Sequence, residues 1–421
     1  MTNHQPVSSI KALSDFRCQL LLSAGYLFLI FLWSTSIAFN GAPDESTHFF
    51  LLEFLKAFHA LPIPSEPLEA MTGPISGHTW QKGDFWYHGL PFPHIVGALV
   101  TTYIGGWFIP SDALYMAARS FNWLLGCVFI CALFRTARTI GLPLLLSAGI
   151  AACVSAIPQV TFVFSYLNSD AYGLASIGLL ISTMTGLIKS PIRKRSLYFG
   201  VSVGLMLMAK LYFIPALVFA ISVILANRIF KNKAILAHLP TMIVAAMAVS
   251  VPMLILVYLK YGEISGISGQ LAFVEMHKLN PAAGFGTCYL NCHGGLINTK
   301  TVSEWLNLTL MSYFSVTGWM NIFIANAYYK IAGIILLAIM AVSVYQVKPL
   351  SANESKREIA LNYALPVAMI IALYPAITLL SLLASQSSLP QPQGRYLFVT
   401  IPFIGLLLSM TAQRIIARNN K

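Results

Sequence analysis

The chain alternates long, almost uncharged apolar runs with short polar segments. The runs are of the length an α-helix needs to cross a bilayer. The pattern therefore predicts an all-α polytopic membrane protein with about ten transmembrane helices, at roughly 19–39, 113–134, 141–162, 171–188, 195–209, 210–227, 234–257, 328–347, 359–384 and 396–413. The first run is longer than a signal-peptide core, so we expect it to be a retained signal anchor.

Two segments between these spans are long, and they divide the chain. The predicted organisation is a cytoplasmic N-terminus, a transmembrane module, an external loop, and C-terminal helices with a cytoplasmic tail: 1–18, 19–257 (including an external loop 40–112), 258–327 and 328–421. In the first loop, an apolar run rich in proline and glycine ends at Pro110 and is expected to be interfacial or re-entrant. In the second, a further interfacial helix is expected from Ser303 to Phe323.

Composition supports a bilayer environment. The 421 residues are 57% hydrophobic and only 10% charged, with a mean hydropathy of +0.73. A soluble domain carries about 25% charged residues. So much apolar surface cannot be covered in water, and the length therefore limits the number of membrane spans rather than the number of soluble domains.

The net charge of +12 is distributed along the chain as a topology signal. Most of the 26 basic residues fall on one side of the predicted spans, together with few of the 14 acidic ones. Because positive residues favour the cytoplasmic side, both termini are expected in the cytoplasm. The basic excess is thereby explained, and nucleic acid is not an expected partner.

Two of the six cysteines lie close together in an external segment. Cys288 and Cys292, in GTCYLNCHGG, could form a disulfide in an oxidising compartment, with free thiols as the alternative. A zinc site is less favoured, since His293 alone adds too few soft ligands. The other four cysteines lie in or beside spans, where cysteine behaves as a small hydrophobe.

Ionisable residues at the external ends of the spans are the main functional signal. Charges at membrane depth are costly and mark candidate functional sites. On this topology, seven such residues would converge at one outer-leaflet cavity: Asp44, Glu45, His48, Arg119, Asp170, Lys210 and Arg395. Structural interpretations remain open for each. Asp44 or Asp170 could cap a helix, and Glu45 could interact with a helix dipole. His48 could be a packed interfacial histidine, and the three basic residues could bind structurally or reach lipid headgroups.

Carboxylates beside cations at an outer membrane surface suit sugar transfer from a lipid phosphate. A carboxylate can take the proton of an acceptor hydroxyl, and Arg or Lys can stabilise the departing phosphate. The donor carries its own activation, so no nucleotide-binding loop is required. The sequence contains no GxxxxGK[ST] motif and no GxGxxG placed between a strand and a helix.

Ordered motifs then provide a family resemblance. PDESTHF resembles the PDExxHF signature of a bacterial multi-pass family in the GT-C glycosyltransferase superfamily, one long classed only as a domain of unknown function. Similar segments follow in the expected order: ARSFNWLLG, YLNSDAYGLA, AKLYFIPAL, SVTGWMNIF and QGRYLFVTIPF. The resemblance spans residues 43 to about 405 and implies a GT-C fold with an extracytoplasmic active site.

The resemblance also implies roles for individual residues. Asp44 would be the general base, and Asp170 would orient the acceptor or a metal. Lys210 and Arg395 would lie near the donor phosphate. Glu45, which shares the first motif with Asp44, is expected to be catalytic. His48 of the same motif, together with Arg119 and Tyr396 of the later motifs, is expected to bind substrate. A divalent cation, Mg²⁺ or Mn²⁺, held by Asp44, Glu45 and Asp170 is left open.

Substrates and location follow from the same resemblance. We expect a polyprenyl-phosphate sugar donor, a polysaccharide or lipopolysaccharide acceptor such as O-antigen, inversion at the anomeric carbon, and a bacterial inner membrane. A transporter or flippase for lipid-linked saccharides is the main alternative, although it would place charges near the midplane in two related halves. A non-catalytic scaffold in an envelope assembly is a third hypothesis.

Overall fold

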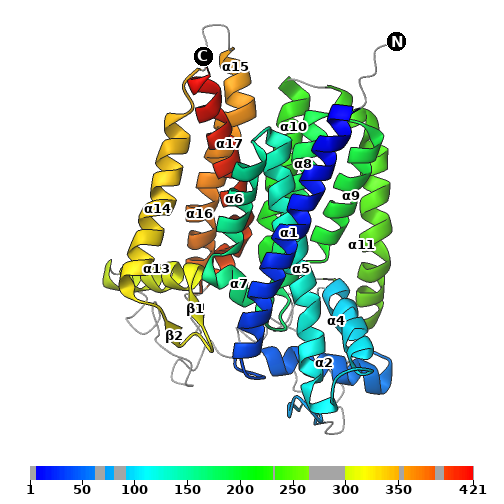
Figure 1. The fold of residues 1–421 in the computed structure, drawn as a ribbon. Helices are drawn as coiled ribbons and strands as arrows, with labels where there is room; N and C mark the ends of the chain where they lie inside the picture. Colours follow the sequence, from blue (N-terminus) through cyan, green and yellow to red (C-terminus); the bar gives the residue numbers. More distant parts are fainter. Residues whose placement is uncertain are drawn as a thin grey trace.

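The chain folds into an α-helical bundle with one short β-hairpin, as seen in a computed structural model (Figure 1). The structure describes residues 6–61, 72–79, 92–230, 233–264, 299–349, 355–384 and 393–420. The helices of the first half are α1 (Pro6–Ser36), α2 (Glu45–Phe58), α4 (Phe92–Gly105), α5 (Leu114–Ile140), α6 (Leu144–Ser155), α7 (Pro158–Ser165), α8 (Asp170–Lys189), α9 (Arg193–Leu207), α10 (Ile214–Phe230) and α11 (Leu239–Tyr261).

The second half adds further helices and the hairpin. These are α13 (Thr299–Phe314), β1 (Val316–Thr317), β2 (Ile322–Phe323), α14 (Asn326–Tyr345), α15 (Lys356–Ile359), α16 (Leu365–Ala384) and α17 (Ile401–Asn419). Short 3₁₀ turns connect or begin several helices: η1 (Ser111–Ala113), η2 (Leu211–Phe213), η3 (Lys233–His238) and η5 (Gly394–Thr400). A π-helical turn, η4 (Ala360–Ala364), joins α15 to α16.

The chain is a polytopic membrane protein. Among the described residues, seven helices are long and apolar enough to cross a bilayer, or eight if the bent α6–α7 pair is one span. The ten expected spans all contain helix, but those at 195–209 and 210–227 correspond to α9 and α10, which have 15 and 17 residues and are not among the seven, and the segment 141–162 is broken. The break bends the chain by 70° between α6 and α7, where Pro158 begins the second piece.

One end of the bundle carries most of the non-spanning structure. In Figure 1, α2 lies across this end, close to α4 and the tips of several long helices. The start of α1 and the end of α17 lie at the opposite end. We call the first of these the α2 end. α4 is the helix expected as an interfacial or re-entrant piece; it packs along α5 and, with 14 residues, is too short to cross a bilayer.

The prediction of a helix from Ser303 to Phe323 is wrong in its second half. α13 ends at Phe314, and the chain then turns through the antiparallel β1–β2 pair. Gly318 and Met320 have φ values of 60° and 62°, a left-handed conformation that no regular helix contains. The SVTGWMNIF segment is therefore a hairpin.

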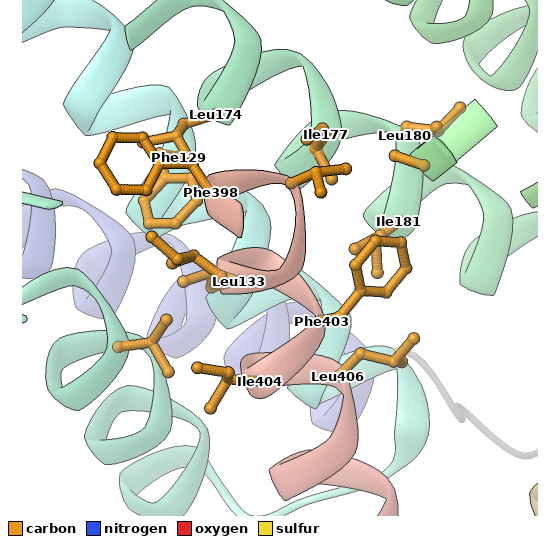
Figure 2. Close-up of a cluster of buried hydrophobic side chains, with 14 of the residues drawn as sticks. Phe129, Leu133, Leu174, Ile177, Leu180, Ile181, Phe398, Phe403, Ile404 and Leu406 are labelled. Atoms are coloured by element: carbon orange, nitrogen blue, oxygen red, sulfur yellow. The ribbon is translucent and has the colours of Figure 1, made fainter. Parts of the chain in front are cut away.

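Buried side chains from α5, α8 and α17 form the centre of the bundle (Figure 2). Phe129 and Leu133 of α5 face the α8 side chains Leu174 and Ile177, and α17 adds Phe403. Because η5 runs directly into α17, this packing also fixes where η5 begins. The aromatic and aliphatic core thus anchors the helix starts that carry the polar residues described next.

Candidate active site

The predicted site residues lie at helix starts at the α2 end. Asp44 immediately precedes α2, Asp170 is the first residue of α8, Lys210 precedes η2, and Arg395 lies in η5. Segments far apart in sequence therefore bring their first turns to one end of the bundle (Figure 1). Three ion pairs connect these residues: Glu45–Arg119, Asp170–Lys210 and Asp44–Arg395.

Glu45 and Arg119 form a fully buried, bidentate pair. Arg119 Nε donates to Glu45 Oε1 at 2.6 Å, and Nη2 donates to Oε2 at 2.7 Å. The backbone N–H groups of Asn40 and Leu167 also donate to the Glu45 carboxylate, at 2.9 and 3.2 Å. Both charged side chains are 0% exposed, so neither reaches a substrate in this arrangement. The pair holds the turn before α2 against α5 and against the segment leading into α8.

Arg119 also completes the end of α1. Its Nη1 donates to the carbonyls of Ser34 and Ile37, at 2.7 and 2.8 Å, and its Nη2 to that of Ala38 at 3.0 Å. The last carbonyls of a helix have no partner within it, and a buried guanidinium is a strong donor to them. The expected substrate-binding residue therefore joins α1, α5 and the turn that carries Asp44.

Asp44 is the carboxylate of the first motif that solvent can reach. It occupies the N-cap position of α2, yet its side chain makes no capping hydrogen bond. Its backbone is left-handed, with φ 62° and ψ 8°, a conformation that costs energy and is enriched at functional sites. The carboxylate is 33% exposed, and its Oδ2 lies 3.8 Å from Arg395 Nη1. The capping interpretation therefore does not account for this side chain.

Asp170 is held by two donors from the next helical segment. Lys210 Nζ donates to Asp170 Oδ1 at 2.9 Å, and the Tyr212 hydroxyl donates to the same oxygen. The capping role left open for Asp170 belongs instead to Asn168, whose Oδ1 accepts from the backbone N–H groups of Asp170 and Ala171, both at 3.0 Å. The Asp170 carboxylate is thus committed to Lys210 and Tyr212 rather than to its own helix.

Aromatic rings connect the Asp170 cluster to η5. The rings of Tyr212 and Tyr396 meet edge to face with centroids 5.8 Å apart. The Arg395 guanidinium lies 5.7 Å from the centre of the Tyr396 ring, and Lys210 Nζ lies 6.0 Å from that of Tyr212. Each site cation therefore lies within the range of cation–π attraction of one tyrosine, Arg395 of Tyr396 and Lys210 of Tyr212.

The backbone of η5 is fixed by α13. The N–H of Gly394 donates to Ser312 Oγ at 2.7 Å. A Cβ atom at residue 394 would lie 2.1 Å from the backbone nitrogen of Tyr313, a distance that real Cβ atoms do not reach. Only glycine therefore lets η5 approach α13 this closely, and the approach determines the position of Arg395.

Sequence reasoning missed His94 and the asparagine that holds it. His94 Nε2 lies 2.9 Å from Asn122 Oδ1, while Asn122 Nδ2 donates to the carbonyls of Tyr166 and Asn168. The imidazole is buried, and burial lowers the pKa of His94 to about 4. The His48 ring stands edge to face with it at 6.2 Å, so His48 packs inside the site wall. Asn122, Asn168 and Tyr212 lie within the quoted motifs, but His94 had no such signal.

The carboxylates do not fit a shared divalent cation. Glu45 is saturated by Arg119 and two backbone donors, and an ammonium group sits 2.9 Å from Asp170 Oδ1. In the part of the chain that the structure describes, no group of three or more His, Cys, Asp or Glu side chains is arranged to hold a metal. Cys288 and Cys292, expected to pair, lie outside the described residues.

Comparison with known proteins gives remote structural likenesses. No protein-family model matches the sequence, and no curated protein sequence matches it. ArnT from Cupriavidus metallidurans, solved bound to undecaprenyl phosphate, is 14% identical, with 94% of this chain and 77% of ArnT covered and a TM-score of 0.44. The oligosaccharyltransferase of Archaeoglobus fulgidus, solved in the apo form, is 12% identical over 93% of this chain, which spans half of that protein's length, with a TM-score of 0.49.

Both neighbours are GT-C glycosyltransferases, the superfamily that the sequence motifs resemble.

Proposed function

We propose that this protein is a GT-C glycosyltransferase that moves a sugar from a polyprenyl-phosphate donor to an envelope polysaccharide or lipopolysaccharide. The observation that carries the proposal is the ion pair between Arg395 and Asp44 at the α2 end, where Asp44 has an accessible carboxylate and a left-handed backbone conformation. Lys210, held by Asp170, supplies a second cation nearby. A base beside two cations is the combination that transfer from a lipid phosphate requires.

The proposed reaction is a single displacement at the anomeric carbon. The acceptor oxygen forms a bond to that carbon while the bond to the phosphate oxygen breaks, and the acceptor proton passes to the Asp44 carboxylate. The bonding electrons leave with the polyprenyl phosphate, whose added charge Arg395 and Lys210 stabilise. Attack opposite to the leaving group would invert the anomeric centre.

The remaining site residues position these groups. Between the two carboxylates of the first motif, we assign the role of base to Asp44, because Glu45 is fully buried and already bonded to Arg119 and to backbone N–H groups. We assign Glu45 and Arg119 the role of fixing the turn that carries Asp44. Asp170 and Tyr212 fix Lys210, while Tyr396 and His48 line the site.

The location of the reaction is also proposed. The distribution of basic residues along the sequence supports cytoplasmic termini. The start of α1 and the end of α17 lie opposite the α2 end (Figure 1), so the site would face the extracytoplasmic side of a bacterial inner membrane.

The test is sugar transfer in membranes or nanodiscs. Purified protein would receive polyprenyl-phosphate sugars and envelope polysaccharide, and product would be measured for wild type, Asp44→Asn, Arg395→Ala and the control Asp112→Asn. Asp112 is an exposed carboxylate in η1, just before α5, and takes part in none of the three ion pairs. We expect transfer to fall by at least about 100-fold in the first two variants and to stay at the wild-type rate in the control. Wild-type transfer in both site variants, with insertion intact, would favour the transporter or scaffold hypothesis.

A further inference from the structure

The three ion pairs of the site differ systematically in burial and length. Glu45–Arg119 is 0% exposed on both sides and bidentate. Asp170–Lys210 is 8% and 13% exposed, at 2.9 Å. Asp44–Arg395 is 33% and 30% exposed, at 3.8 Å, beyond hydrogen-bond length. The third pair is therefore the weakest and the one a ligand can reach.

Deep burial and short N···O distances make the other two pairs poor candidates for exchange. Breaking a buried pair leaves an uncompensated charge and costs about 3–5 kcal/mol. Asp44 and Arg395 are each about one-third exposed and joined at 3.8 Å, which is closer to a surface pair, whose typical contribution is only about 0.2–1 kcal/mol. An incoming anion would thus displace Asp44 from Arg395 far more readily than it would separate Asp170 from Lys210.

Asp44 and a phosphate also compete for the same guanidinium. An arginine binds phosphate through two parallel N–H···O bonds, a stronger arrangement than a single long contact with a carboxylate. A carboxylate turned toward Arg395 is, conversely, poorly placed to take a proton from an acceptor hydroxyl. The resting pair therefore occupies both functional groups at once.

We propose that the Asp44–Arg395 ion pair is the resting state of the site, and that the phosphate of the lipid donor takes the place of Asp44 on Arg395. Exchange releases the Asp44 carboxylate to act as base only when a donor is present. Donor binding then precedes productive acceptor binding, which protects the base from water-borne hydroxyls in the empty site. This inference rests on the proposed function and adds its order of events.

The backbone of Asp44 provides a clean variant. Asn tolerates the left-handed region as well as Asp does, so Asp44→Asn keeps the turn while removing the charge that competes with phosphate. The variant should lose transfer and yet bind the lipid phosphate more tightly. Simple loss of a donor contact would weaken binding instead.

The experiment measures binding of undecaprenyl phosphate to the full chain in nanodiscs. We expect Asp44→Asn to bind up to about fivefold more tightly than wild type, the fold-change that release of an exposed ion pair allows. Asp112→Asn should bind like wild type, which excludes a general effect of net charge. In an Arg395→Ala background, Asp44→Asn should give no tightening, because the competition would already be gone.

The outcomes separate the inference from the proposed function. Equal or weaker binding by Asp44→Asn, with wild-type binding measurable and transfer lost, overturns the exchange and leaves the glycosyltransferase assignment standing. Tightening that persists in the Arg395→Ala background also overturns it. No binding of undecaprenyl phosphate by wild type overturns the donor class and, with it, the exchange.

Discussion

Replacing Gly394 by alanine should misplace Arg395 without removing any charged group. The new Cβ would lie 2.1 Å from the Tyr313 nitrogen and 2.5 Å from the Ser312 carbonyl carbon, whereas ordinary contacts begin at 3.4 Å. Both neighbours are backbone atoms of α13, so no side chain can rotate away. η5 and α13 must separate by about 1.3 Å, the difference between these distances.

A displacement of this size should be visible in activity. Misplacing a catalytic group by about 1 Å costs about 100-fold in rate, and overpacking costs about 1–3 kcal/mol in the free energy of unfolding. The assays are sugar transfer and thermal unfolding in detergent, with Gly25→Ala in α1 as the control, since a Cβ there meets nothing within 4 Å. Wild-type transfer by Gly394→Ala would refute the idea that η5 packing positions Arg395.

Three further predictions concern the supporting residues. Glu45→Gln should lower the free energy of unfolding by about 3–5 kcal/mol, because Arg119 would keep a buried unpaired charge. A loss below about 1 kcal/mol, measured by denaturant unfolding, would contradict the role of the Glu45–Arg119 pair in fixing the turn before α2. Tyr212→Phe removes one of two donors to Asp170 and should reduce transfer about fivefold, the effect of about 1 kcal/mol; an unchanged rate would show that Lys210 needs no such support. For His94, the pKa of about 4 lies below the unfolded value of about 6.5. The contribution of His94 to the free energy of unfolding should therefore be constant above about pH 6.5 and fall by about 1.4 kcal/mol per pH unit as the pH drops toward 4. His94→Phe should remove that slope, and a slope unchanged by the substitution would refute the assignment.

The helical bundle could be predicted because the bilayer imposes a simple rule. Every spanning segment must satisfy its own backbone, so apolar length alone identifies helices. The rule gives no information on geometry within a run. It does not predict the 70° bend between α6 and α7, where Pro158 begins α7, or the hairpin formed at Gly318 and Met320 within an apolar segment. Both features depend on local backbone angles that hydrophobic patterning does not contain.

The convergence of charges at one end was predicted, but their pairing was not. The position of a charge along a span gives its depth in the membrane, and the similar depth of Asp44, Asp170, Lys210 and Arg395 predicted that they lie at the same end of the bundle. Which acid meets which base depends on the rotation of each helix and on packing between distant segments. His94 escaped notice for the same reason, since its partner Asn122 lies on another helix.

The Glu45–Arg119 clamp has a consequence for biosynthesis. The turn before α2 is held by α5 and by Leu167, and its charged counterpart Arg395 lies near the end of the chain. The carbonyls of Ser34 and Ile37, at and just after the end of α1, likewise accept their hydrogen bonds from Arg119 only once α5 has been inserted. A nascent chain inserted span by span would therefore leave the first motif without its counterpart Arg395 until η5 and α17 have entered the membrane. The Asp44–Arg395 pair would then form only once α17 packs against α5 and α8, so its assembly depends on segments far apart in the sequence.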